Sequence, residues 1–339
     1  MSELNKILLT CLLLFVGTIS FAQGGSLSPY DLKESYLEKR ASYESSSTKQ
    51  IASQNQKELD RIVEVLEVNA PASYEYHLVK YINGNFDVSQ KNHLFEAYSL
   101  KPDALEVRKE MFGFYALTGD NSKQKEFALK IKNSYSSNVL NYYKVLVSNS
   151  KVRTVFLSGE EDAYPLLVLQ SLGQIRNDIS IVNLDFLQND DYRKRVQKKL
   201  GMSNTSFVGS ESKFLTTALG SINDKAFVST TVGQSYIRGV ADNCYLTGLH
   251  YQYSCSNQRK ELDAFWTTTQ QKISGLNLES RADKKLYTNF LPPLLTLYKL
   301  KIGAQEKDPI LRKGIMTLAQ KTGKETAVNE ILKEYEQTE

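Results

Sequence analysis

The chain has 339 residues and a formal net charge of +4, from 42 basic and 38 acidic side chains. This length exceeds that of one ordinary domain, so we expect more than one hydrophobic core. Hydrophobic residues at 41% and charged residues at 24% are typical of a soluble globular protein rather than a disordered or membrane-spanning one. The charges form no long single-sign block, so the sequence lacks the basic stripe typical of nucleic-acid-binding proteins. We therefore expect no nucleic-acid partner.

Residues 1–22 have the pattern of a signal peptide. Lys6 supplies the positive start, residues 7–21 are largely apolar, and small residues stand at both positions that signal peptidase reads before a cut after Ala22. The apolar stretch is shorter than the roughly 20 residues of a transmembrane helix. It also continues past Cys11, where lipidation would require it to end, so we do not expect a lipoprotein. The mature protein is expected in the periplasm, with membrane association only through a partner.

Residues 23–55 are expected to form a flexible tether, because their polar composition, as in the stretch 45–48, cannot bury enough apolar surface to order itself. One short helix could form within it, around Tyr30, Leu32, Tyr36 and Leu37.

Residues 56–145 are predicted to be helical. Leu59, Ile62, Val63 and Leu66 fall on one helix face, and helices then alternate with short turns. Two successive helical pairs can be overlaid, since Tyr81 and Tyr115 are 34 residues apart and each is followed by a glycine, Gly84 and Gly119. Ala97, Leu100 and Pro102 close the first pair, and Ala128 lies in the second helix of the next.

This period and these closing residues resemble the tetratricopeptide repeat over about residues 57–143. The resemblance is degenerate, since Leu78 and Phe112 stand where the family usually has a small residue. It implies stacked helical hairpins with a concave face that docks a peptide or protein. The alternative is a helical spacer.

Residues 146–255 have the pattern of a small α/β unit. Residues 154–157 are a continuous β-branched and aromatic run of the kind found in a strand buried on both faces, and residues 179–184 and 226–229 are the predicted second and third strands. The intervening segments are long enough for helical crossovers, so the strands should be parallel and joined right-handedly. Asp162 is placed to cap the first crossover helix and Asp190 the second. The fold class is therefore α/β with α-helical repeats, its sheet small, parallel and Rossmann-like.

Polar side chains follow each of these three strands. Ligands of open parallel sheets bind at the carboxyl ends of the strands. The candidate ligand or docking edge consists of Ser158, Glu160, Glu161, Asp162, Asp185, Thr230 and Thr231. Four carboxylates in one crevice could hold a hard cation or divide general acid and base roles. Alternatively, the aspartates cap helices and the remaining acids are merely exposed.

The string 159–166, Gly-Glu-Glu-Asp-Ala-Tyr-Pro-Leu, resembles a signature in the soluble extracytoplasmic part of bacterial O-mannosyltransferase-like membrane proteins. Val182-Asn183-Leu184 and the stretch 246–249 extend the resemblance, which covers about residues 150–250. The chain departs from the family at Glu160 and Glu161, where Asp and Asn are typical, and it lacks the transmembrane spans. The resemblance implies an exported module that works beside repeats, and it does not carry glycosyl transfer over.

Residues 256–339 return to helical patterns. Leu262, Phe265, Trp266 and Ile273 form one stripe, and the stretches 310–320 and 327–335 predict a last helical hairpin. These helices are expected to pack against the sheet and the repeats. Cys244 and Cys255 could form a disulfide only if the chain turns back near Gly248, and two unpaired thiols are the alternative.

No complete catalytic motif is present. The sequence has no glycine-rich dinucleotide loop, no phosphate loop and no nucleophile elbow. His77, His93 and His250 are widely separated, which gives neither a zinc cage nor the parts of a triad. We therefore expect no cofactor, no metal and no catalytic residue. The first hypothesis is a protein-interaction or scaffold protein of the periplasm, for example an accessory subunit of an envelope or outer-membrane complex. The alternative is a glycan- or metal-binding enzyme that acts at the acidic crevice.

Overall fold

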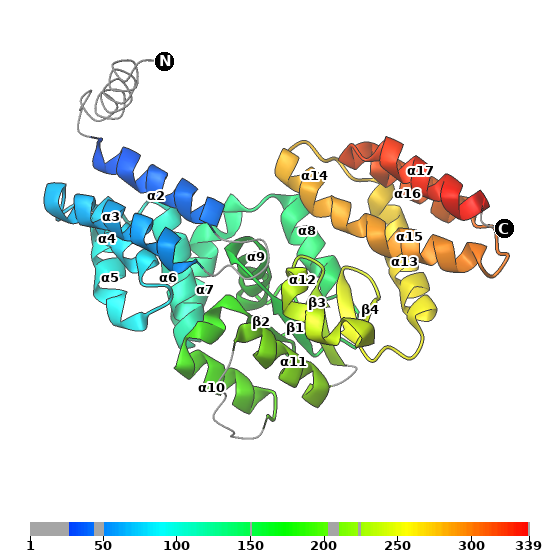
Figure 1. Ribbon diagram of the computed structural model, residues 1–339, viewed down its shortest axis with the longest axis horizontal. Helices are drawn as coiled ribbons and strands as arrows, with labels where there is room; N and C mark the ends of the chain where they lie inside the picture. Colours follow the sequence, from blue (N-terminus) through cyan, green and yellow to red (C-terminus); the bar gives the residue numbers. More distant parts are fainter. Residues whose placement is uncertain (1–26, 44–50, 150, 203–209, 223–224, 338–339) are drawn as a thin grey trace, which may run out of the picture.

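The computed structural model describes residues 27–43, 51–149, 151–202, 210–222 and 225–337. The expected signal peptide lies outside these residues. Figure 1 shows helices α2 to α7 at one end of the molecule, a sheet in the middle and helices α13 to α17 at the other end. The expected fold class, α/β with helical repeats, is confirmed.

The N-terminal part consists of helices joined by short turns. Their bounds are α2 (Pro29–Tyr43), α3 (Ser53–Asn69), α4 (Tyr74–Asn83), α5 (Lys91–Leu100), α6 (Leu105–Thr118), α7 (Asn121–Ile131) and α8 (Ser137–Leu146). Helices α4 and α5 form one hairpin and α6 and α7 the next, as the 34-residue spacing predicts. Tyr81, Ala97 and Ala128 are buried, whereas Leu100 is exposed.

Helix α2 lies within the stretch expected as a tether. Its Tyr36 is fully buried, in a core that also contains Leu59, Val63 and Tyr76. The buried Lys33 bonds to Glu106, 73 residues away. The short helix that the sequence allowed around Tyr30, Leu32, Tyr36 and Leu37 is thus present. Its attachment to the rest of the protein was not predictable from the polar composition, because its partners are distant in the sequence.

The middle part alternates strands and helices. Their bounds are β1 (Thr154–Leu157), α9 (Glu160–Ser171), β2 (Ser180–Asn183), α10 (Asp190–Lys199), α11 (Glu211–Ile222), β3 (Ala226–Ser229), α12 (Gln234–Ile237), β4 (Cys244–Leu246) and β5 (His250–Tyr253). A short 3-10 helix, η3 (Asp185–Gln188), follows β2.

The five-stranded sheet has the order β2-β1-β3-β5-β4. Strand β1 is parallel to both β2 and β3, with Thr154 opposite Ser180 on one side and Ala226 on the other. The sheet is not purely parallel, because the β4–β5 hairpin adds to the edge of β3 in the antiparallel direction. The crossover after β1 leads to β2 on one side of β1, and the connection after β2 leads to β3 on the other side. The reversal of strand order therefore lies between β1 and β3, where ligands of such sheets bind.

The C-terminal part is a group of packed helices. Their bounds are α13 (Gln258–Ser274), α14 (Arg281–Tyr287), α15 (Leu291–Ile302), α16 (Pro309–Thr322) and α17 (Glu325–Gln337). The expected last hairpin is formed by α16 and α17, and the expected stripe on α13 buries Leu262, Trp266 and Ile273.

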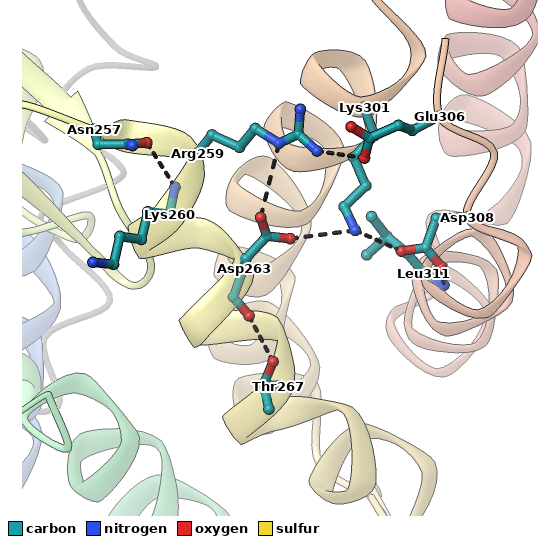
Figure 2. Close-up of polar contacts among 9 residues, drawn as sticks. All are labelled: Asn257, Arg259, Lys260, Asp263, Thr267, Lys301, Glu306, Asp308 and Leu311. Carbon is teal, nitrogen blue, oxygen red and sulfur yellow. Dashed lines mark hydrogen bonds and ion pairs between the residues drawn. The ribbon is translucent and has the colours of Figure 1, made fainter. Parts of the chain in front are cut away.

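Charged side chains tie three of these helices together (Figure 2). Lys301 of α15 lies 3.3 Å from Asp263 of α13 and 2.8 Å from Asp308, whose carboxylate also caps α16 by accepting from the Leu311 amide. Arg259 pairs with Asp263 and Glu306. All these charges have partners of opposite sign, so we interpret the network as one that stabilises the packing of α13, α15 and α16.

Candidate functional site

The turn after β1 is held by a buried carboxylate. Gly159 has a φ of 85°, a conformation that favours glycine, and it precedes the first residue of α9. Asp185, the first residue of η3 after β2, accepts hydrogen bonds from the Ser158 hydroxyl at 3.0 Å and from the Gly159 amide at 2.5 Å. Only 5% of Asp185 is exposed. The structure thus brings two of the predicted residues together, Ser158 and Asp185, in contacts that shape the turn.

Asp162 does not cap α9, in contrast to the prediction. The helix begins at Glu160, so Asp162 lies inside its first turn, where it accepts a hydrogen bond from the Tyr143 hydroxyl at 2.7 Å. Pro165 has no amide hydrogen to give to the Glu161 carbonyl four residues earlier. The Tyr143 hydroxyl lies 3.1 Å from that carbonyl oxygen and compensates for the missing bond.

The second predicted cap is displaced by one residue. The side chain of Asn189 accepts from the Tyr192 amide at 3.0 Å and caps α10, so Asp190 is the first residue of the helix. Both aspartates still lie in first turns, where a negative charge is favourable near the helix N-terminus.

Glu160 faces a carboxyl group that the sequence analysis missed. Its side chain is hydrogen-bonded to Glu110 of α6, and burial, followed by the neighbouring Glu160 charge, raises the pKa of Glu110 well above its usual range. The buried hydroxyls of Tyr81 and Tyr164 lie near this pair, and burial raises the pKa of both. Glu161, by contrast, is exposed. Nothing in the sequence around Glu110 signals this role, because the pairing depends on how α6 packs against α9.

The end of β3 is also occupied by contacts within the protein. The Thr230 hydroxyl donates to the Leu249 carbonyl at 3.2 Å, and the Thr231 hydroxyl lies 2.7 Å from that of Ser229. Tyr142 of α8, fully buried, lies beside Thr230. Tyr236, 2% exposed, is hydrogen-bonded to Ser158. Tyrosine side chains therefore fill the space at the carboxyl ends of β1 and β3.

The carboxylates of the predicted crevice thus have different partners. Asp185 faces the β1 turn, Asp162 faces α8, and Glu160 faces α6. Among the described residues, no group of three or more His, Cys, Asp or Glu side chains could hold a metal ion.

Two of the three histidines meet in the fold although they are 16 residues apart. The Nδ1 atoms of His77 on α4 and His93 on α5 lie 2.9 Å apart, and the ring centroids are 5.2 Å apart. The pKa of each is lowered, chiefly by burial. The ring nitrogens point at each other in one imidazole–imidazole hydrogen bond, which belongs to the α4–α5 hairpin.

Cys244 and Cys255 lie on either side of the β4–β5 hairpin that turns at Gly248, the turn on which a disulfide depended. Both are free thiols in the structure.

A separate groove of about 310 Å³ lies between α13 and α16, and its lining includes Trp266, Gln270, Ser274 and Lys313. Trp266 reaches it because Gly314 leaves room for the indole ring.

Comparison with known proteins supplies a family. Residues 138–321, more than half of the chain, match the model of the TMEM260-associated domain 2. The chain belongs to this family. The matched region of this TMEM260-associated chain runs from α8 through the sheet and into α16, and it includes the β1–α9 turn with its glutamates. No curated protein and no solved structure matches the chain. No helix within the described residues is long and apolar enough to cross a membrane.

Proposed function

We propose that this TMEM260-associated chain is an exported accessory protein that binds a protein partner in the cell envelope and does not catalyse a reaction. One observation carries the proposal. The strand-order reversal between β1 and β3, where open α/β sheets bind ligands, is filled by Tyr142 and Tyr236. Beside them, Asp185 accepts hydrogen bonds from the Ser158 hydroxyl and the Gly159 amide, so its carboxylate is engaged within the protein.

The helical hairpins α4–α5 and α6–α7 are the proposed docking element. Their spacing and turns resemble tetratricopeptide repeats, which recruit partners through an inner face. The family's description associates its domain with TMEM260. We propose that the partner is a TMEM260-like protein. The resemblance of the β1–α9 turn to O-mannosyltransferase-like membrane proteins supports the same class of partner. The periplasm is the proposed location, and an outer-membrane complex is one such setting.

A tagged full-length chain, expressed in its own host and purified from detergent-solubilised envelopes, tests the proposal. We expect one partner to copurify at fixed stoichiometry through size exclusion. The control is a variant with Glu161→Ala, an exposed change that should leave the complex intact. Elution as an isolated chain, after mild crosslinking as well, would count against the proposal.

The Glu110–Glu160 pair favours a second candidate function, a glycan- or metal-binding enzyme. Two carboxyl groups with one raised pKa, near buried tyrosines, are a known arrangement for general acid catalysis. Calorimetric titration with glycans and divalent cations tests this candidate. If Glu110→Gln and Glu160→Gln each abolish binding and Glu161→Ala preserves it, the enzyme would be favoured over the accessory protein.

A further inference from the structure

Helix α2 is attached to the hairpins mainly by three side chains. Lys33, Tyr36 and Arg40 are spaced by three and four residues, so they lie on one face of the helix. Ser28 and Asp31 form a capping box that starts the helix, with the Asp31 amide donating to the Ser28 hydroxyl at 3.2 Å. The helix therefore has its own start signal and presents one basic, aromatic face to the protein.

Each of the three side chains meets an acceptor on another helix or turn. Lys33, with 4% of its side chain exposed, lies 2.7 Å from Glu106 of α6. The Tyr36 hydroxyl donates to the Asn83 side chain at 3.1 Å, and Arg40 donates to the Asn85 side chain at 2.9 Å. These contacts span the end of α4 and the start of α6, the first helices of the two hairpins.

The acceptors are held in place by a network that does not involve α2. Gln56 of α3 donates to Asp60 at 2.9 Å and to Asn83 at 2.8 Å, and Asn83 donates to Asp60 at 2.8 Å. Asn85 donates to Gln56 at 3.2 Å and has a φ of 50°, an uncommon conformation that directs its side chain to this site. The oxygens that meet Tyr36 and Arg40 are thus positioned by α3 and α4.

Beneath these polar contacts lies an apolar floor. Leu32 and Tyr36 of α2 pack over Leu59, Val63 and Tyr76. Of the 15 residues of α2, only Leu32, Lys33 and Tyr36 are buried. The apolar contact between α2 and the rest of the protein is therefore small, and much of the specificity for this helix comes from charged and amide contacts. A helix held in an apolar trough with a polar rim is one of the recurring modes by which proteins bind helical peptides.

We propose that the trough formed by α3, α4 and α6 is a helix-binding site, that α2 is its built-in occupant, and that a partner helix with Lys, Tyr and Arg at α2's spacing displaces it. This inference rests on the proposed function, because it assigns that partner's recognition element. Glu106 selects the lysine, and the Asn83 and Asn85 oxygens select the tyrosine hydroxyl and the guanidinium.

A fluorescent peptide of residues 27–43 is the probe, titrated into the full chain by anisotropy. The double variant Lys33→Glu with Arg40→Glu should release α2, since it places an acid opposite Glu106 and removes the donor that bonds to the Asn85 side chain. We expect the wild-type peptide to bind this variant at least tenfold more tightly than it binds the unchanged chain. The matched control chain carries Lys39→Glu, which alters the exposed pair with Glu58, and it should behave as the unchanged chain does. A peptide with the same two reversals should bind neither.

Hydrogen exchange of the unchanged chain gives a reading that needs no variant. Amides of α2 should exchange through an opening that leaves α4 and α6 protected, at rates at least tenfold higher. Absence of peptide binding to a folded double variant, or exchange of α2 only together with α4 and α6, would overturn the inference. Neither readout uses the envelope partner. If the peptide binds the double variant but no partner copurifies from envelopes, the proposed function is refuted and the helix-binding site is still supported.

Discussion

Gly113→Ala tests the contact that joins the helical hairpins to the sheet region. Gly113 lies inside α6, and a Cβ atom there would stand 1.9 Å from the hydroxyl oxygen of Tyr164 on α9 and 2.8 Å from its Cζ. Real Cβ atoms almost never come closer than 3.0 Å to another heavy atom, and ordinary contact begins at 3.4 Å. The tyrosine oxygen would therefore have to retreat by about 1.5 Å.

Tyr164 has little room to do so. Only 1% of it is exposed, and its ring packs edge-on against Phe112 at 5.3 Å and near Phe186 at 6.3 Å. Overpacking of this kind typically costs about 1–3 kcal/mol, whereas alanine regains up to about 1 kcal/mol of helix propensity. We expect a net loss of about 1–2 kcal/mol in the free energy of unfolding.

Urea denaturation followed by circular dichroism measures this loss. Gly220→Ala is the matched control, because Gly220 lies in α11 with nothing within 4 Å of its new Cβ, and it should stabilise the protein by about 0.5–1 kcal/mol. Adding Tyr164→Phe to Gly113→Ala removes the closest atom and should restore part of the loss. If Gly113→Ala were as stabilising as Gly220→Ala, the described packing of α6 against α9 would be refuted.

Three further predictions concern buried polar groups. Burial lowers the pKa of His250 to about 3, so below pH 6.5 the unfolded chain binds a proton that the folded chain does not. The free energy of unfolding should therefore fall by roughly 1.4 kcal/mol per pH unit as the pH drops from about 6.5 toward 3. His250→Gln should flatten this slope in urea titrations, and an unchanged slope would contradict the assignment. Burial raises the pKa of the Cys244 thiol to about 11 and also raises that of Cys255, so thiol reagents at pH 7 should modify the folded chain at least tenfold more slowly than the unfolded one. Equal rates for the folded and unfolded chains would contradict this burial. Asp185→Ala should cost about 3 kcal/mol in urea denaturation, because the Ser158 hydroxyl and the Gly159 amide lose their buried acceptor; a loss below about 1 kcal/mol would show that the turn does not depend on it.

The parallel part of the sheet was the most predictable part of the fold, whereas the antiparallel β4–β5 hairpin was not part of the predicted sheet. Strands β1, β2 and β3 are buried on both faces, so the residues at their centres are apolar, and the crossover lengths fix their parallel direction. The hairpins α4–α5 and α6–α7 were predictable from their 34-residue spacing.

Features that depend on tertiary packing were not predictable. The start of α9 was misplaced because Gly159 adopts a positive φ, and the bonds at the turn come from Asp185, 26 residues away. The Glu110–Glu160 pair and the His77–His93 contact arise only when helices distant in the sequence pack together. The short helix expected around Tyr30, Leu32, Tyr36 and Leu37 is present as α2, but its attachment was not predictable because Lys33 is buried against the distant Glu106.

The central claim is that this TMEM260-associated chain works by binding a protein partner. Native mass spectrometry of the tagged full-length chain, purified from envelopes of its own host, tests that claim most directly. We expect a complex of fixed stoichiometry that contains one further protein. An isolated chain that instead retains a bound glycan or metal ion, lost on Glu110→Gln or Glu160→Gln, would contradict it.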